Sequence, residues 1–390
     1  MSAEFVYLDH NATTPLDPIV FEAMVPWLRD QHGNPSSVHH WGRQAREAVE
    51  EARERVADLL GVPALEVVFT ASGTEANNGV IFGLAAAAGN RGRLVISALE
   101  HPSVKAAADR LESEGMEVVR VPPSADGVVL ASEVVAALDD ETRLVCLMLA
   151  HNEVGTLQPV AEVAAVCRDR GIPVLCDAVQ AVGKIPVHPQ DLGIDFLTLG
   201  GHKFHGPLGA AALWIRDGVE VPPYLVGGGQ ERHRRASTPN VPALVGLGAA
   251  AARAAAGVEE RYNHLASLRD RFEAGLQAIA DSVVHCGDSP RLPNTSSVAF
   301  AGVEGQALMI RLDLAGFAVS TGSACSSGVV EPSRALLAMG ISPELALSTL
   351  RVSFGVPNTV EEVDRFLATL GAVVGDLRQA ETAVRSGRRR

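Results

Sequence analysis

The segment "IPVLCDAVQAVGKIPVHPQDLGIDFLTLGGHKF", residues 172–204, holds two short apolar runs, each of which leads into a chemically active side chain. The first run ends at Asp177, and the second is followed by Gly200, Gly201 and Lys203. Short apolar runs bounded by turn residues predict buried strands. Because ligands of open α/β sheets sit beyond the carboxyl ends of the strands, we expect Asp177 and Lys203 at the ends of neighbouring strands, either as an ion pair or as parts of a site.

Lysine is rare in this chain, because only three of its 33 Lys and Arg residues are lysines. Arginine therefore supplies the ordinary positive charge. A lysine amine, unlike a guanidinium, can lose its proton and act as a nucleophile. The position of Lys203 after a strand therefore indicates a chemical role for its amine.

The alternation of apolar strands with amphipathic helical stretches extends over most of the chain and predicts an α/β fold with a mostly parallel, doubly wound sheet. We expect a large domain over 16–255 and a smaller α+β domain formed by 1–15 and 256–390. A single long helix is predicted over 241–278, between the two. The strands expected in the large sheet are residues 64–70, 92–98, 116–122, 142–150, 172–178 and 194–200, and those of the small domain lie near 295–301 and 350–355.

The composition is that of a globular protein, with 20% charged and 47% hydrophobic residues in 390. A net charge of −13 argues against direct nucleic-acid binding, which needs a basic surface. No apolar run approaches the roughly 20 residues of a membrane span, so no membrane partner is expected. The five cysteines form no CxxC pair and no metal-binding pattern. The first residues, "MSAEFVYLDH", have no basic and no apolar region, so we expect no secretory signal peptide. These features favour a cytoplasmic protein.

Polar residues follow several other predicted strands. Ser72 and Glu75 have the spacing of a capping box, so a helix should begin there, and its N-terminus either binds an anion or is simply capped. His101 and Asn152 each follow a strand, where a surface histidine and a turn asparagine are the ordinary alternatives to a site. Gln180, three residues after Asp177, has the alternative of a loop hydrogen bond.

Cys325 lies in "VSTGSACSSGVVEP", residues 319–332, a Ser- and Gly-rich stretch that predicts a mobile loop. A thiol on such a loop can ionise and reach a substrate, because only the thiolate is a good nucleophile; the alternative is a loop cysteine without a role. Arg351 has the planar guanidinium that clamps a carboxylate, or it pairs with a nearby glutamate. Three other cysteines lie in apolar surroundings and are expected in the core, namely Cys146, Cys167 and Cys176, whereas Cys286 stays ambiguous.

Ten motifs, in order along nearly the whole chain, resemble those of the cysteine desulfurases of the NifS/IscS type, which are class V aminotransferases and pyridoxal-phosphate enzymes of fold type I. The motifs are "YLDHNATTPLDP", "GNPSSVH", "SGTEANN", "EHPSV", "HNEVGTLQP", "CDAVQAVGK", "GGHKFHGPLG", "GGGQERHRR", "GSACSSG" and "LRVSFG". The resemblance implies a large domain with a mostly parallel sheet, a smaller α+β domain and the cofactor pyridoxal 5'-phosphate.

The resemblance also implies how the cofactor ring is held. Lys203 attaches it covalently and later moves the substrate Cα proton, Asp177 pairs with the pyridine nitrogen, Gln180 bonds the phenolic oxygen, and His101 stacks on the ring and assists proton transfer. The implied phosphate ligands are Gly73, Thr74, Gly200, Gly201, His202 and, across a homodimer interface, Thr238. The family usually has serine where this chain has Gly200.

For the reaction, the resemblance implies that Asn152 and Arg351 bind the carboxylate of L-cysteine and that Cys325 takes its sulfur as a persulfide, which releases L-alanine. The sulfur would pass to an acceptor such as an iron–sulfur scaffold protein or to tRNA thiolation. No resident metal is implied, although Cys325 would meet a transient iron–sulfur cluster. The alternatives are a selenocysteine lyase, another class V aminotransferase, or an inactive paralogue that acts as a scaffold.

Overall fold

The computed structural model describes residues 5–321 and 331–387, and its largest element is a seven-stranded sheet. The strand order is β2-β8-β7-β6-β5-β3-β4. Only the pairs that β8 makes with β7 and β2 are antiparallel, so the predicted mostly parallel sheet is confirmed. The strands are β2 (Val67–Thr70), β3 (Arg93–Ser97), β4 (Glu117–Val121), β5 (Thr142–Cys146), β6 (Val174–Asp177), β7 (Phe196–Gly200) and β8 (Ala211–Ile215).

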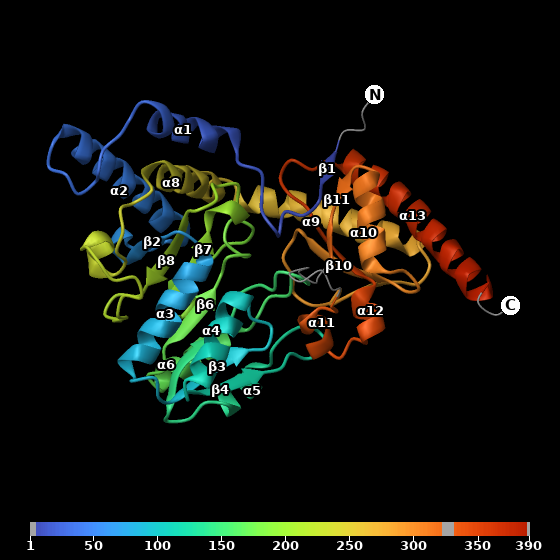
Figure 1. The fold of residues 1–390 in the computed structure, drawn as a ribbon, viewed down its shortest axis with the longest axis horizontal. Helices are drawn as coiled ribbons and strands as arrows, with labels where there is room; N and C mark the ends of the chain where they lie inside the picture. Colours follow the sequence, from blue (N-terminus) through green and yellow to red (C-terminus); the bar gives the residue numbers. More distant parts are fainter. Residues whose placement is uncertain (1–4, 322–330, 388–390) are drawn as a thin grey trace.

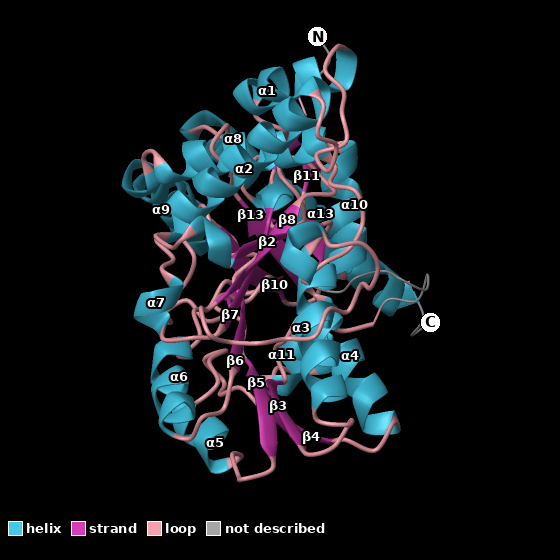
Figure 2. Ribbon diagram, turned by 90° about the vertical axis from the view of Figure 1, so that its left-hand side faces the viewer, coloured by secondary structure: helices cyan, strands magenta, loops and turns pink. Residues whose placement is uncertain are grey.

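Helices cover both faces of this sheet. Figure 2 shows α3 and α4 on one side and α5, α6 and α7 on the other. Alternate residues of one strand supply the two cores, because side chains along a strand point to opposite faces: Val95 packs in one apolar cluster, and Leu94 and Ile96 in the other. The helices are α1 (Pro18–Arg29), α2 (His40–Leu60), α3 (Gly73–Ala87), α4 (Pro102–Ser113), α5 (Ala131–Ala136), α6 (Val160–Asp169), α7 (Pro189–Leu192) and α8 (Val241–Ala255).

A second sheet, ordered β12-β13-β10-β9, forms from the last third of the chain. Its strands are β9 (Ser282–Val284), β10 (Thr295–Phe300), β12 (Ser320–Thr321) and β13 (Thr349–Ser353). Its apolar core also takes residues from the N-terminus, Val6 and Leu8. The helices of this region are α9 (Val258–Gly275), α10 (Gly305–Leu314), α11 (Arg334–Ala338), α12 (Pro343–Leu347) and α13 (Val360–Gly387).

The N-terminal segment connects the two sheets. β1 (Val6–Tyr7) pairs in parallel with β11 (Phe317–Ala318), so the expected packing of the N-terminus on the C-terminal region is confirmed. From there the segment crosses to α1 and α2 over the large sheet (Figure 1). The domain limits at 15/16 and 255/256 stay a prediction.

The predicted single helix over 241–278 is wrong. The structure has two helices, α8 and α9, bent by 79° at a short break. Gly257 takes a left-handed φ of 87°, which interrupts the helical backbone, and the Arg261 guanidinium donates to the exposed carbonyls of Arg253 and Ala254 at the end of α8. No single helix in the described ranges is long and apolar enough to cross a membrane, and this bent pair passes that test by length and composition alone.

Candidate active site

The strand ends bring Asp177 and Lys203 to the same edge of the large sheet. Asp177 is the last residue of β6, and β6 pairs in parallel with β7, with Asp177 opposite Thr198. Lys203 follows β7 on a single 3₁₀ turn, Gly201–Lys203. The predicted neighbouring strands are confirmed. Within the described ranges, Asp177 and Lys203 do not form an ion pair, so the simplest explanation of their proximity does not apply.

Asp177 is a buried carboxylate that accepts hydrogen bonds from neutral N–H groups. Its Oδ2 accepts from Asn77 Nδ2 at 2.8 Å, and its Oδ1 accepts from the backbone N–H of Val179 at 3.0 Å. Asp177 as a whole is 7% exposed. A buried carboxylate is expensive unless it meets a cation, and these two bonds leave acceptor capacity on both oxygens. The carboxylate is therefore suited to a cationic ligand group.

His101 connects to Asp177 through two residues that the sequence did not single out. His101 is the N-cap of α4, and its Nδ1 accepts from the Ser103 N–H at 3.2 Å, so the proton of the neutral ring is on Nε2. Asn77 Nδ2 donates to Ser103 Oγ at 3.0 Å and also to Asp177. Partial burial lowers the pKa of His101, and the nearby Asp177 carboxylate opposes this shift. Asn77 and Ser103 lie inside recognised motifs, but sequence spacing does not show that they touch.

The Lys203 amine is held in a partly buried position by the N-terminal segment. Its Nζ donates to the backbone oxygens of Asn11 at 2.6 Å and Ala12 at 2.8 Å. Burial, together with the Arg351 guanidinium, lowers its pKa to about 8. The amine is therefore much easier to deprotonate than an ordinary lysine, which is what a nucleophilic amine requires.

The N-terminus of α3 lies beside the same sheet edge. Ser72 Oγ accepts from the Glu75 N–H at 3.1 Å, and Glu75 Oε2 accepts from the Ala71 N–H at 3.0 Å, so the predicted helix start is confirmed. A Cβ on Gly73 would lie 2.8 Å from a methyl of Val179, which shows that the helix end approaches the turn after Asp177. N–H groups at such a helix end favour an anion such as a phosphate.

The other predicted phosphate ligands are only partly brought together. Gly200 ends β7 next to His202, whose Nδ1 lies 3.2 Å from Thr13 Oγ1, and burial lowers the pKa of His202 to about 4. Thr74 is exposed at the start of α3, and Gly201 is buried in the turn before His202. Thr238 is exposed in the loop before α8; because its predicted role needs a second copy of the chain, it stays a prediction.

The two residues predicted to bind the substrate carboxylate, Asn152 and Arg351, are in contact with each other. Arg351 Nη1 donates to the backbone oxygen of Asn152 at 3.0 Å, and Nη2 donates to Asp9 Oδ1 at 2.6 Å. Arg351 lies in the middle of β13, and its carboxylate partner is Asp9 instead of a glutamate. The Nε atom is buried and has no partner among the described residues. Arg351 therefore retains an unused donor beside Asn152.

Comparisons with known proteins agree with this geometry. The family Aminotransferase class-V matches residues 6–366. The chain belongs to this family. A cysteine desulfurase IscS of Methanosarcina thermophila is 42% identical over 374 residues, 96% of this chain and 93% of that protein. A NifS-like protein of known structure has a TM-score of 0.90 at 37% identity and covers 95% of this chain and 99% of its own. The structure of SspA in complex with cysteine has a TM-score of 0.79 at 33% identity, with 89% and 98% covered.

These relatives place the class V aminotransferase chain among the cysteine desulfurases of the NifS/IscS type, and its architecture is fold type I. Cys325, the nucleophile of the predicted reaction, lies outside the described residues. Of the other cysteines, Cys146, Cys167 and Cys176 are buried, as predicted for core positions. Burial raises the pKa of Cys167 to about 11, which makes it a poor nucleophile.

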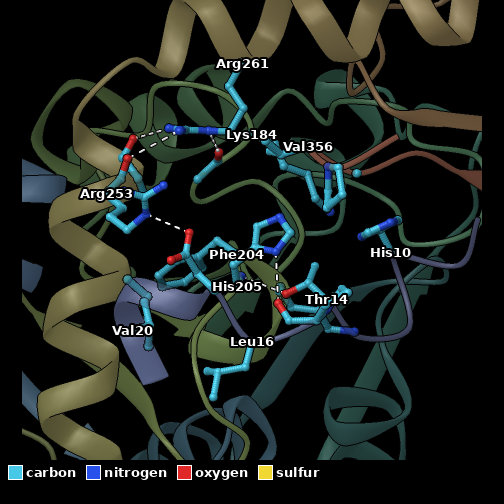
Figure 3. Close-up of a pocket in the computed structure, with 18 of the residues that line it drawn as sticks. His10, Thr14, Leu16, Val20, Lys184, Phe204, His205, Arg253, Arg261 and Val356 are labelled. Atoms are coloured by element: carbon cyan, nitrogen blue, oxygen red, sulfur yellow. Dashed lines mark hydrogen bonds and ion pairs between the residues drawn. The ribbon is translucent and has the colours of Figure 1, made fainter. Parts of the chain in front are cut away.

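A cavity of about 580 Å³ adjoins the lysine from another side. Lys203 and Lys184 line it, whereas Asp177, Gln180 and His101 do not. Figure 3 shows its wall, with Arg253 and Arg261 on one side of it. Arg253 Nε forms an ion pair with Asp17 Oδ2 at 2.7 Å. This cavity does not contain the carboxylate and histidine predicted to hold the cofactor ring, so it is not the site built at the strand ends.

Proposed function

We propose that this protein is a pyridoxal-phosphate-dependent L-cysteine desulfurase that produces L-alanine and a persulfide on Cys325. The observation that carries the proposal is a pair of residues at the sheet edge, Lys203 and Asp177. Burial lowers the pKa of the Lys203 amine to about 8, and the buried Asp177 carboxylate is not its ion-pair partner. The curated relatives named as cysteine desulfurases support the choice of reaction within the family.

The residues present fit the cofactor. Lys203 supplies the amine for covalent attachment, Asp177 supplies a buried acceptor for a protonated ring nitrogen, and the N-terminus of α3 supplies N–H groups for a phosphate. His101 and Gln180 would contact the ring, and Gly73, Thr74, Gly200, His202 and Thr238 would hold the phosphate. When bound, pyridoxal phosphate withdraws electrons from the substrate Cα and makes its proton removable.

The substrate would be oriented by Arg351 and Asn152, with the carboxylate of L-cysteine on the unused guanidinium donor. Lys203 would then remove the Cα proton with its neutral amine, and His101 would assist through the proton on Nε2. The Cys325 thiolate would attack the substrate sulfur, so that an S–S bond forms as the Cβ–S bond breaks. The products balance as L-alanine and one enzyme persulfide.

We also propose a cytoplasmic homodimer that passes the sulfur to an acceptor protein, of the iron–sulfur scaffold type or in tRNA thiolation. The predicted phosphate contact of Thr238 needs a second copy of the chain, and large apolar side chains that are exposed in the single chain are candidates for the interface. Among them are Val38, Leu208 and Val226, which are 84%, 71% and 82% exposed in the single chain.

The decisive experiment is incubation of the holoenzyme with L-cysteine and no other thiol, followed by intact mass measurement. We expect one added sulfur per subunit, located on Cys325 by peptide mapping, and an equal amount of L-alanine. The Cys325→Ala variant should bind the cofactor and gain no sulfur. Alanine and sulfide formation by that variant at the wild-type rate would contradict the persulfide mechanism.

A further inference from the structure

A second lysine is buried beside the site, and the proposed reaction does not use it. Lys184 is 5% exposed and has no acidic partner among the described residues. Its Nζ donates to Gln180 Oε1 at 2.8 Å and to Asn11 Oδ1 at 3.1 Å. Burial lowers the pKa of Lys184 well below its ordinary value, and the nearby charge of Lys203 acts in the same direction.

The number of acceptors around Lys184 matches a neutral amine. A neutral –NH₂ group has two hydrogens, and two amide oxygens accept them, whereas an ammonium would leave a third hydrogen without an acceptor among the described residues. A position that only filled space would be better served by an apolar side chain, because burying an amine carries a desolvation cost. The amine therefore has a polar task at this position.

Gln180 shows what that task is. Its Oε1 accepts from Lys184, and its Nε2 donates to the Asn11 backbone oxygen at 2.9 Å. These two bonds fix which end of the amide is oxygen and which is nitrogen, since the Asn11 carbonyl can only accept. Nε2 has a second hydrogen that no described residue receives.

The side chains of Lys184 and Gln180 both donate hydrogen bonds to Asn11. Asn11 is 1% exposed, and all four of its polar groups are bonded. Its N–H donates to Ser353 Oγ at 2.9 Å, and its Nδ2 donates to Thr295 Oγ1 at 2.8 Å, so the second sheet holds it in place. Its backbone oxygen also receives the Lys203 amine.

We propose that Lys184 is a positioning residue for Gln180: its amine, held between the side-chain oxygens of Asn11 and Gln180, keeps one N–H of the Gln180 amide directed to the ring oxygen of the cofactor. The inference rests on the proposed function, because it assigns a task toward a bound pyridoxal phosphate. It assigns Lys184 no contact with the cofactor or the substrate.

The test compares Lys184→Met with a matched control, Asn294→Ala. Methionine is an uncharged chain of similar length that cannot donate. Asn294 Nδ2 donates to the same Asn11 Oδ1 at 3.1 Å and to the Phe354 carbonyl, but it does not touch Gln180. The control therefore removes one hydrogen bond to Asn11 but leaves the hydrogen bonds of the Gln180 amide in place.

The dissociation constant of pyridoxal phosphate is measured on each apoprotein, with visible circular dichroism of the bound cofactor and the melting temperature. We expect Lys184→Met to weaken cofactor binding about tenfold and to change the dichroism band, because it leaves the buried Gln180 Oε1 unpaired. Asn294→Ala should lower the melting temperature but leave the band unchanged. A wild-type dissociation constant and band in Lys184→Met would overturn the proposal.

The experiment also distinguishes a failure of the proposed function from a failure of the role of Lys184. A wild-type protein that binds no pyridoxal phosphate would refute the proposed function itself, whatever Lys184 does. If Lys184→Met does not fold, Lys184→Gln replaces it, because its amide keeps a donor in the space but is too short to serve both acceptors. The same change in band and affinity is expected of it, and wild-type behaviour would again contradict the role of Lys184.

Discussion

At position 203, burial and the Arg351 guanidinium act together on one amine and lower its pKa to about 8. Only the neutral amine attacks the cofactor aldehyde, and the protonated form present below this pKa is inert. We therefore expect the rate of cofactor attachment to the apoprotein to rise about tenfold per pH unit below pH 8 and to level off above it. Stopped-flow absorbance measures this rate. A rate that continued to rise to about pH 10 would indicate an ordinary lysine.

Gly200 offers a second test at the scale of one residue. A Cβ added there would lie 3.6 Å from both His202 and Val179, which is ordinary contact, and its φ of −131° suits any residue. We expect Gly200→Ser to fold normally and to bind pyridoxal phosphate about fivefold more tightly, because its hydroxyl adds one hydrogen bond to the phosphate. Equilibrium dialysis measures the affinity.

Gly201→Ser is the matched control for that substitution. A Cβ on Gly201 would lie 2.9 Å from Leu247 and 3.1 Å from the Ala210 carbonyl, so the added side chain has no room. We expect this variant to lose stability and cofactor affinity together. Equal affinities of Gly200→Ser and the wild type would remove Gly200 from the set of phosphate ligands.

At the scale of elements, the break between α8 and α9 depends on Gly257. Its left-handed φ of 87° is costly for a residue with a Cβ, so Gly257→Ala should lower the free energy of unfolding by about 1 kcal/mol. Gly375→Ala, inside α13 where a Cβ meets nothing within 4 Å, should raise it by up to about 1 kcal/mol. Urea denaturation gives both values. A neutral or stabilising Gly257→Ala would show that the bend does not need glycine.

The strand ends could be predicted from the sequence, but the contacts between them could not. Asp177 and Lys203 follow apolar runs, and sheet topology alone then brings them to one edge. The helix break was missed because helical spacing of apolar residues continues on both sides of Gly257, with alanines in α8 and with Leu265, Leu268 and Phe272 in α9. Asn11 and Gln180 are 169 positions apart, and neither the hydrophobic pattern nor the motif spacing shows that they are hydrogen-bonded. The sequence therefore did not predict that an N-terminal residue holds Lys203 and Gln180.

On the scale of the whole molecule, the N-terminal segment couples the smaller core to the site. The Leu8 N–H donates to the Ala318 carbonyl and its own carbonyl accepts from the Ser353 N–H, both at 2.8 Å. Three residues later, Asn11 holds Lys203 and Gln180. A substitution that disturbs the packing of the second core should therefore also displace Asn11 and weaken cofactor binding.

Leu8→Ala tests this coupling. Leu8 is 0% exposed in the core of the second sheet, so the variant should lose about 3 kcal/mol of stability through a cavity, and we expect weaker cofactor binding as well. Leu268→Ala removes an equally buried leucine from the same core, on α9, an element that does not belong to the N-terminal segment. Calorimetry should show similar destabilisation of the two variants, while the dissociation constant of pyridoxal phosphate rises only in Leu8→Ala. Equal rises in both would show that overall stability, and not the segment, controls the site.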